Sequence, residues 1–378
     1  MRRDNNRINQ SDHVAVSFDT FYDGRNGYQF TLTAAGGLRD GTIVDEGIEV
    51  DWNGVYEARS ARDGKGWSAE FAIPFKTLRY PAGGEQTWHM QLRRVVRSNG
   101  KNEITYLTPM KALWGLFGST KFAYTATLVG LEVPKPGLNL EIKPYFNSAV
   151  NTDLVAATPV RNDVSPDAGV DMKYGITKSL TADFTYNTDF SQVEIDEAQI
   201  NLTRFNLNFP EKREFFLESP GIFDFGAPFS TGSIPGPDAP TLFYSRRIGL
   251  SGSRAVPVIG GGRLSGRAGP WTIGALNMET DDDATARAAQ TNFSVLRLRR
   301  NILRRSNIGA IYTRRSVSTV GSGANDVGGV DANLALFDNI YITNYIARSR
   351  TDVLQGHDLA YRSMFHYNSD RYGLAVDR

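Results

Sequence analysis

The chain has 378 residues, a formal net charge of +1 and no cysteine. This length allows two domains, and a net charge near zero provides no large field that would attract nucleic acid or anionic lipid. The lack of cysteine excludes disulfides, thiolate metal sites and cysteine nucleophiles, and it leaves the cellular compartment open.

The sequence contains no run of about 18 apolar residues, so no transmembrane helix is expected. Its first residues, MRRDNNRINQSD, contain no apolar core, so they are not expected to act as a signal peptide. These observations leave membrane-spanning strands open, because such strands alternate in polarity and have a weak hydropathy signal.

Alternation of apolar and polar residues predicts strands in five segments of the first third: 13–22, 27–33, 48–58, 66–74 and 88–94. In the first segment Val16 and Phe18 lie on one face, and Ser17 and Asp19 lie on the other. Glycine-rich turns such as YDGRNG and ARDGKG separate the segments. This pattern is typical of antiparallel sheets that pack on one side, and it predicts a β-sandwich.

The stretch SDHVAVSFDTFYDGRNGYQFTLTAAGGLRDG, followed by DWNGVYEARSARDGKGWSAEFAIPFKTLRY, resembles the later part of family-9-like carbohydrate-binding modules. The resemblance implies a partial β-sandwich over residues 1–133 and recognition of carbohydrate. Strands expected upstream in that family have no counterpart here, so the chain is expected to begin within the module.

Candidate carbohydrate-binding residues are Tyr22, Arg25, Tyr28 and Trp52. The first three lie near the YDGRNG turn and are expected to be exposed. Trp52 shares its strand face with apolar residues, so it is a candidate for either a sugar platform or the core.

Four aspartates of this segment are candidate oxygen ligands for calcium: Asp12, Asp19, Asp23 and Asp40. Their spacing differs from that of an EF-hand loop, and solvated surface carboxylates are the alternative interpretation. No other cofactor or metal is expected.

The pattern changes after GLEVPKPGL, residues 130–138, which is expected to be a stiff linker. Beyond it the predicted strands are longer, as in 138–146 and in the two strands joined by a tight turn within 168–187, and from about residue 250 short turns alternate with long loops. This arrangement is typical of outer-membrane barrels, so residues 134–378 are expected to form an antiparallel up-and-down barrel. A soluble all-β array with long loops is the alternative. An interfacial girdle of tyrosines is expected from six residues: Tyr174, Tyr186, Tyr312, Tyr345, Tyr361 and Tyr367.

The stretch GVDMKYGITKSLTADFTYNTDFSQVEIDEAQINLTRFNLNFPEKREFFLESPGIFDFG resembles the start of an uncharacterised family of Gram-negative outer-membrane barrels. LFYSRRIGL and GGGRLSGRAGPWTIGALN continue the resemblance, and in that family a family-9-like module precedes the barrel. The resemblance implies an outer-membrane location with a periplasmic N-terminal module, and partners that are glycans and outer-membrane lipid. The barrel is expected to be incomplete, since the family's last strands would lie beyond YGLAVDR.

The charged stretch NFPEKREFFLES, residues 208–219, is expected to fold inward and fill or gate the barrel through Glu211, Lys212, Arg213 and Glu214. Charges next to two phenylalanines would be costly in lipid but tolerable in a wet lumen. A charged rim turn anchored by the two phenylalanines is an equal alternative, and an active site is a third.

No nucleophile elbow, HExxH motif or P-loop occurs, so the sequence favours a protein that is not an enzyme. If it is an enzyme, it is expected to be a glycosidase, and the trial carboxylates are Glu211, Glu214 and Glu218. Three hypotheses therefore stand: an envelope protein that binds or passes glycans, a membrane-associated glycoside hydrolase, and a structural envelope protein without sugar binding. The sequence does not determine the oligomeric state.

Overall fold

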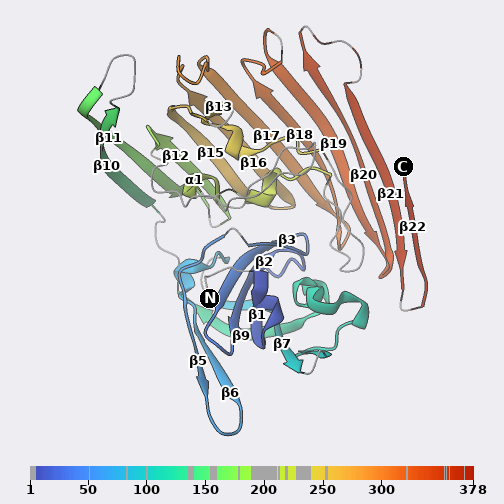
Figure 1. Ribbon diagram of the computed structural model, residues 1–378. Coiled ribbons are helices and arrows are strands. Elements are labelled where there is room, and N and C mark those ends of the chain that lie inside the picture. The colour runs from blue at the N-terminus through green and yellow to red at the C-terminus, as the bar shows by residue number, and fades with distance from the viewer. Residues whose placement is uncertain are drawn as a thin grey trace.

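A computed structural model describes residues 6–50, 52–81, 84–98, 101–134, 140–153, 160–177, 179–188, 211, 213–217, 220–226, 240–251, 254–320, 322–352, 354, 356, 358–369 and 371–378. Its sheets are antiparallel, and the predicted all-β class is confirmed. One group of sheets lies before Pro134, and an eleven-stranded sheet follows from Leu140 (Figure 1).

The N-terminal part, hereafter the module, contains a seven-stranded sheet in the order β4-β3-β2-β1-β7-β8, with β9 also paired to β7. Its strands are β1 (His13–Asp19), β2 (Gly27–Thr33), β3 (Leu38–Val44), β4 (Gly47–Glu49), β7 (Gly84–Ser98), β8 (Lys101–Tyr106) and β9 (Ala126–Val133). A separate hairpin is formed by β5 (Glu57–Arg62) and β6 (Trp67–Ala72).

One face of the module's large sheet is apolar, as the alternation predicts. Val16, Phe30 and Trp88 are buried there, and the hairpin residue Phe71 packs against them with Tyr80. The opposite face carries polar side chains that are also buried, because η1 (Asn6–Gln10) and η3 (Ala112–Thr120) contact it. On that face Gln29 Nε2 donates to Ser17 Oγ over 3.0 Å and to Ser119 Oγ over 2.8 Å.

Two expected elements of this part differ from the structure. Residues 48–58 do not form one strand, since β4 ends at Glu49 and β5 begins at Glu57. The first residues of the expected linker, 130–133, belong to β9, where Leu131 and Val133 pair with β7. Of the rest of that linker the structure describes only Pro134.

The second part is an up-and-down sheet in which each strand pairs with its neighbour along the chain. Its strands are β10 (Leu140–Asp153), β11 (Val160–Gly175), β12 (Leu180–Tyr186), β15 (Val258–Ala268), β16 (Trp271–Thr280), β17 (Thr291–Ile302), β18 (Ser306–Arg315), β19 (Asn325–Leu336), β20 (Ile340–Thr351), β21 (Leu359–Asn368) and β22 (Gly373–Asp377). A two-stranded ribbon, β13 (Leu250–Ser251) and β14 (Arg254–Ala255), and η6 (Ser245–Arg247) precede β15. The sheet is open and curved, with β10 and β22 at its edges (Figure 1).

The predicted alternation of turn lengths is confirmed. Between β15 and β16, β17 and β18, and β19 and β20 the turns hold residues 269–270, 303–305 and 337–339. The opposite rim carries the loops 281–290, 316–324 and 352–358. The module lies against the short-turn rim (Figure 1).

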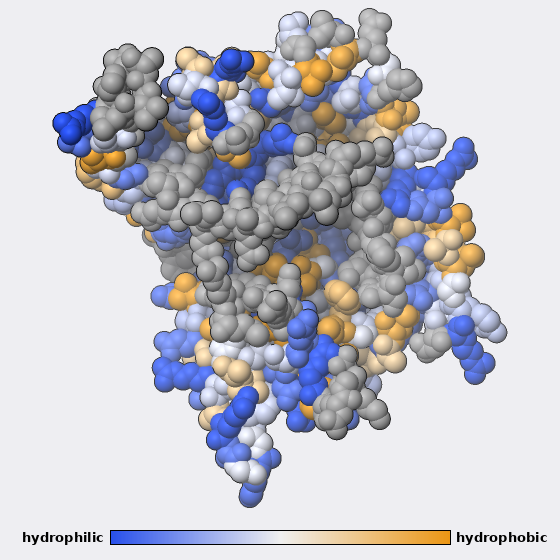
Figure 2. All heavy atoms as spheres, in the orientation of Figure 1, coloured by the Kyte–Doolittle hydropathy of each residue, from blue (hydrophilic) through white to orange (hydrophobic). Residues whose placement is uncertain are grey.

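The two faces of the large sheet differ in polarity. On β17 the inward residues Val295, Arg297 and Arg299 are buried, whereas the outward residues Leu296 and Leu298 are 44% and 36% exposed. Outward apolar side chains are similarly exposed on most of the other strands, and they include Ile142, Phe184, Ile308, Val330, Ile346, Tyr361 and Val376. In Figure 2 hydrophobic residues lie between hydrophilic ones along the edge where β21 and β22 are drawn in Figure 1.

Four of the expected girdle tyrosines are exposed, namely Tyr174, Tyr186, Tyr312 and Tyr361. The expectation for Tyr345 is wrong: its side chain is 9% exposed and packs on the inner face of the sheet, with its ring 5.6 Å from that of Phe225. In the described part of the chain, no helix is long and apolar enough to cross a membrane.

Candidate functional site

A chain segment covers the inner face of the large sheet. This inner segment, residues 211–226, contains α1 (Glu214–Leu217) and η5 (Pro220–Phe223), and it lies within the curve of the sheet in Figure 1. Its residues 212, 218 and 219 are outside the described part, so the predicted roles of Lys212 and Glu218 are not addressed by the structure.

Four phenylalanines attach the inner segment to the large sheet: Phe215, Phe216, Phe223 and Phe225. All four are buried in one cluster with inward residues of β15 to β18 and of β20, among them Met278, Val295 and Ile311. Burial of each phenylalanine side chain contributes about 1.5–3 kcal/mol, which is enough to hold a short segment in place. The two phenylalanines anchor this stretch to strands, as the rim-turn alternative expected, but they do so on the inner face of the sheet and not at its rim.

Inward glycines of the large sheet leave the space that apolar side chains of the inner segment occupy. A Cβ atom at Gly274 would lie 2.6 Å from Ile222 Cγ2, and a Cβ atom at Gly329 would lie 2.7 Å from Phe225 Cζ. By contrast, a Cβ atom at the neighbouring Gly328 would meet no atom within 4 Å. The inner segment therefore fits into depressions that the inward glycines create.

Glu211 and Arg213 form a buried pair at the start of the inner segment. Glu211 Oε1 accepts from Arg213 Nε over 2.8 Å, and Oε2 accepts from Arg213 Nη2 over 2.8 Å and from Ser245 Oγ over 2.6 Å. Burial alone would raise the pKa of the Glu211 carboxyl, but these partners lower it below its ordinary value. Glu211 is therefore held as an anion, which does not suit the proton-donating role that a glycosidase requires.

Glu214 differs from Glu211 because its side chain is largely exposed and pairs with Lys143 of β10. Arg213 also donates to the carbonyls of Ile248 and Ser245, over 2.7 Å and 2.6 Å. Of the four predicted gate residues, Glu211 and Arg213 therefore lock the segment, and Glu214 makes a surface ion pair.

A second ion pair holds the far end of the inner segment. Arg297 and Asp331 bind each other in a bidentate pair, with distances of 2.6 and 2.7 Å, and both side chains are almost fully buried. Asp331 Oδ2 also accepts from the backbone N–H of Gly226 over 3.1 Å. The pair gives two buried charges on the inner face of the sheet their partners, and it ties β17 and β19 to the segment.

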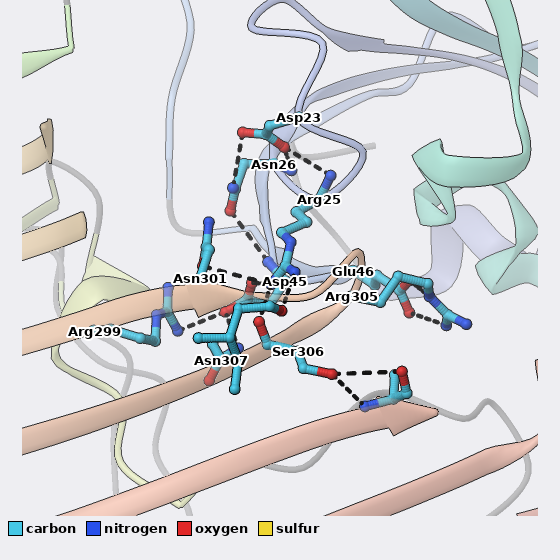
Figure 3. A network of polar contacts seen from close by, with 12 residues as sticks. Asp23, Arg25, Asn26, Asp45, Glu46, Arg299, Asn301, Arg305, Ser306 and Asn307 are labelled. Atoms are coloured by element: carbon cyan, nitrogen blue, oxygen red, sulfur yellow. Dashed lines mark hydrogen bonds and ion pairs between the residues drawn. The ribbon is translucent and has the colours of Figure 1, made fainter. Parts of the chain in front are cut away.

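The module joins the short-turn rim through a buried carboxylate, Glu46. Its Oε2 lies 2.6 Å from Lys121 Nζ in the module, and its Oε1 accepts from Arg305 Nε of the β17–β18 turn over 2.9 Å. Arg305 also donates to the hydroxyls of Tyr124 and Tyr341, over 3.1 and 3.2 Å. Figure 3 shows Arg305 reaching Glu46 across the junction.

Asp45 and Arg25 extend this junction (Figure 3). Asp45 Oδ2 lies 2.7 Å from Arg299 Nη1 and accepts from Asn307 Nδ2 over 3.2 Å. Arg25 donates to three carbonyls of the β17–β18 turn region, including that of Ser306 over 2.8 Å.

The turn that carries Asp45 and Glu46 is strained. Both residues have positive φ, 48° and 70°, and they form the two-residue turn between β3 and β4. Such turns favour Asn and Gly, and each left-handed non-glycine residue costs about 1–2 kcal/mol. The ion pairs across the junction offset this cost, which links the shape of the turn to docking of the module.

The charge state of Glu46 depends on both parts of the protein. Burial would raise the pKa of its carboxyl, but Lys121 and Arg305 outweigh that effect and hold the pKa below its ordinary value. Burial would likewise lower the pKa of Arg305, and Glu46 reverses this, so that the guanidinium stays charged. The junction is therefore ionised at neutral pH.

The predicted carbohydrate residues do not form one exposed surface. The expected exposure is wrong for Arg25, which is 4% exposed within the junction, and for Tyr28, which is 9% exposed in the module core. Trp52 packs at that core, with its ring 5.2 Å from that of Tyr28. Arg25 and Tyr28 were expected to be exposed because the sequence of a turn does not record which distant residues cover it.

Tyr22 alone of the four is exposed, at 46%. Its ring stacks on His89 with 4.0 Å between centroids, and its hydroxyl lies 3.2 Å from Thr127 Oγ1. His89 Nδ1 lies 2.8 Å from Asp19 Oδ2, which fixes the imidazole under the tyrosine. The aromatic pair and its adjacent hydroxyls lie at the module surface, and sugar binding by Tyr22 stays a prediction.

The four candidate calcium ligands hold backbone instead. The carboxylates of Asp12, Asp19, Asp23 and Asp40 accept from the N–H groups of Arg97, Gly24, Arg25 and Gly54, respectively. Within the ranges that the structure describes, no three His, Asp or Glu side chains gather so as to hold a metal ion. Calcium binding stays a prediction.

The sequence analysis did not single out Glu46, Lys121 or Arg305. A signal was present in the text RLRRNILRRSN, residues 297–307, which places five arginines around one short turn. Such a density of positive charge at a rim indicates a partner with carboxylates, and the module supplies Asp45 and Glu46.

A family profile described as a domain of unknown function (DUF5916) matches residues 136–258, from before β10 to the first residue of β15. The match includes the inner segment. No curated protein matches the chain.

We predict that Arg305→Gln loosens the module from the rim without unfolding it, because the Glu46–Lys121 pair remains within the module. Loss of one partner of a buried ion cluster costs about 3–5 kcal/mol. Since the chain has no cysteine, spin labels at Lys65→Cys and Val320→Cys report the distance between the two parts. We expect a broadened distance distribution for Arg305→Gln and an unchanged one for Arg300→Gln.

The same labels test pH dependence. Because the folded pKa of the Glu46 carboxyl is depressed, its contribution to docking of the module is present at pH values above its ordinary pKa of 4.5. This contribution is lost as the pH falls toward the lower folded pKa. An equally narrow distribution in Arg305→Gln at neutral pH would show that the ion cluster does not hold the module.

We predict that Gly329→Ala displaces Phe225 and that Gly328→Ala has no such effect. The new methyl group at residue 329 overlaps the ring, and overpacking of this kind costs about 1–3 kcal/mol. Amide hydrogen exchange of residues 213–226 should therefore accelerate about 5- to 100-fold in Gly329→Ala only. Equal exchange in both variants would contradict the seating of the inner segment in the wall.

Proposed function

We propose that this protein belongs to the outer membrane of a Gram-negative cell, where the large sheet forms part of a membrane-spanning wall and the module lies on its periplasmic rim. The observation that carries the proposal is the polarity of the sheet, whose outward face exposes apolar side chains while its inward face holds buried charges. A sheet in water would place these faces the other way round. Strands β16 to β21 contain 10–12 residues, close to the ~9–11 that a tilted strand needs to cross a bilayer.

The orientation follows from the turns. Outer-membrane barrels have short periplasmic turns and long extracellular loops. The module contacts the short-turn rim at Arg304 and Arg305, so it lies on the periplasmic side. The loops 281–290, 316–324 and 352–358 then face the outside of the cell.

Within this wall the inner segment is suited to a gate. It is attached through aromatic packing and two ion pairs, and Gly221 approaches the module, since a Cβ atom there would lie 3.3 Å from Glu49 Cγ. A ligand on the module side and a ligand in the lumen would therefore both meet this segment. We infer that the protein binds glycans and passes them through the wall.

The hydrolase hypothesis is not favoured. Glu211 is paired with Arg213, and Glu214 lies in a surface ion pair, so neither of these two trial carboxylates is placed as a free acid. The third, Glu218, lies outside the described residues. The structural hypothesis remains the alternative that a binding experiment decides.

We predict that the complete protein fractionates with outer membranes and shows heat-modifiable mobility in gels. Leu296→Lys places a charge on the exposed apolar face and should lower the free energy of unfolding in lipid by about 2–4 kcal/mol, seen as conversion at a lower temperature. Ser294→Lys, on the same face of β17 but next to the polar residues Asn277 and Asn292, is the matched control, with an expected cost of about 0–1 kcal/mol. A complete protein found only in the soluble fraction would end the proposal.

We predict that the complete protein binds glycans on an array and that Tyr22→Ala weakens binding about 3- to 10-fold, as expected for loss of one aromatic contact. Tyr372→Ala, which removes a tyrosine that is 73% exposed in the β21–β22 turn, is the control and should leave binding unchanged. Binding to no glycan would leave the structural hypothesis in its place.

A further inference from the structure

A cavity of about 260 Å³ lies at the long-loop rim, away from the module. It is bounded by the region around η6 and β13, by the loop 281–290, and by the ends of β16, β17 and β18. Sites for drug-sized ligands measure about 300–1,000 Å³, so this cavity suits a smaller group, on the scale of one sugar ring.

Three arginines from three different elements line the cavity. Arg247 ends η6, Arg287 lies in the loop 281–290, and Arg315 ends β18. The Arg315 guanidinium lies 5.2 Å from the centroid of the Phe293 ring, which also lines the cavity. Three like charges around one space repel one another, and an anion bound between them relieves that repulsion.

No carboxylate is among the described residues that line the cavity, and no ion pair within the described part of the chain involves Arg247, Arg287 or Arg315. Four acids lie close to the lining residues in sequence, Glu279, Asp281, Asp282 and Asp283, and none of them lines the cavity. Asp281 Oδ1 accepts from the Asp282 N–H over 2.9 Å. Asp283 accepts from Thr285 Oγ1 and from the Ala286 N–H, over 2.6 and 2.7 Å, and Glu279 accepts from Asn292 Nδ2 over 2.7 Å.

Hydrogen bonds hold the residues around the cavity in place. Ser251 Oγ donates to the carbonyl of Ala286 over 2.9 Å, which ties β13 to the loop. Thr280 Oγ1 and Thr291 Oγ1 donate to the carbonyls of Thr291 and Ala289, over 3.2 and 2.7 Å. Because these hydroxyls donate to the backbone, their oxygens can still accept a hydrogen bond from a ligand hydroxyl.

We propose that this cavity binds an acidic saccharide unit, with its anionic group held by Arg247, Arg287 and Arg315 and its hydroxyls directed to the threonine and serine oxygens. Guanidinium groups bind carboxylate and sulfate through charge-assisted, bidentate hydrogen bonds, and hydroxyl acceptors suit a sugar. The inference deepens the proposed function, on which it rests, because it names the class of glycan that would bind at the long-loop rim.

The test is titration of the detergent-solubilised full chain with glucuronate, with glucose as the neutral probe and inorganic phosphate as the free anion. We expect glucuronate to bind, glucose to bind at least tenfold more weakly, and glucuronate affinity to fall as salt is added. Arg247→Gln and Arg287→Gln should each weaken glucuronate binding about tenfold or more, as loss of a charge-assisted hydrogen bond implies. These two residues are exposed, so their replacement should leave the fold intact.

Arg314→Gln is the matched control, because Arg314 precedes Arg315 on β18 but lies on the outward face, where it pairs with Asp326. Glucuronate affinity unchanged by Arg247→Gln and Arg287→Gln, or lowered equally by Arg314→Gln, would overturn the inference. Binding of phosphate without glucuronate would also overturn it, since the site would then hold a free anion only.

Fractionation separates this inference from the proposed function. An outer-membrane protein that fails to bind glucuronate would remove the inference alone. A soluble protein that binds glucuronate through these arginines would remove the proposed function alone.

Discussion

The two-residue period of the large sheet is the constraint on which the rest of the structure depends. Because successive side chains of a strand point to opposite faces, each strand commits one face to apolar residues and the other to polar ones. The sheet places Leu296 and Leu298 outward and Arg297 and Arg299 inward. An inward face of buried charge requires partners, and Asp331 of β19 pairs with Arg297 while Asp45 of the module pairs with Arg299.

Buried ion pairs decide how those partners sit. The Arg297–Asp331 pair, which also receives the N–H of Gly226, positions the inner segment, and Glu46 positions the module between Lys121 and Arg305. Such pairs add little net stability compared with apolar packing, but breaking one is costly, so they favour one arrangement over alternatives. The large sheet, the inner segment and the module are therefore one connected assembly. Displacement of one part would strain the ion pairs that hold the others.

The two proposed recognition surfaces lie at opposite ends of this assembly. Near the module surface the Tyr22–His89 stack offers a flat aromatic surface, whereas at the opposite rim three arginines surround a small cavity. The carboxylates between them are used for structure, as the pairing of Glu211 with Arg213 illustrates. Under the proposed function, this distribution suits a protein that binds and transfers a ligand.

Local sequence left open whether the stretch that contains Phe215 and Phe216 folds inward or forms a rim turn, but it predicted what depends on neighbouring residues: most of the strands, the alternation of their faces, and the short and long turns. These features follow from backbone geometry and local polarity, which a linear pattern records. Only the tertiary structure decided that Arg25 is covered by the β17–β18 turn, that Tyr28 lies in the core and that Glu46 meets Arg305. Glu46 and Arg305 are 259 positions apart, and their contact depends on how two sheets dock, which no local pattern encodes.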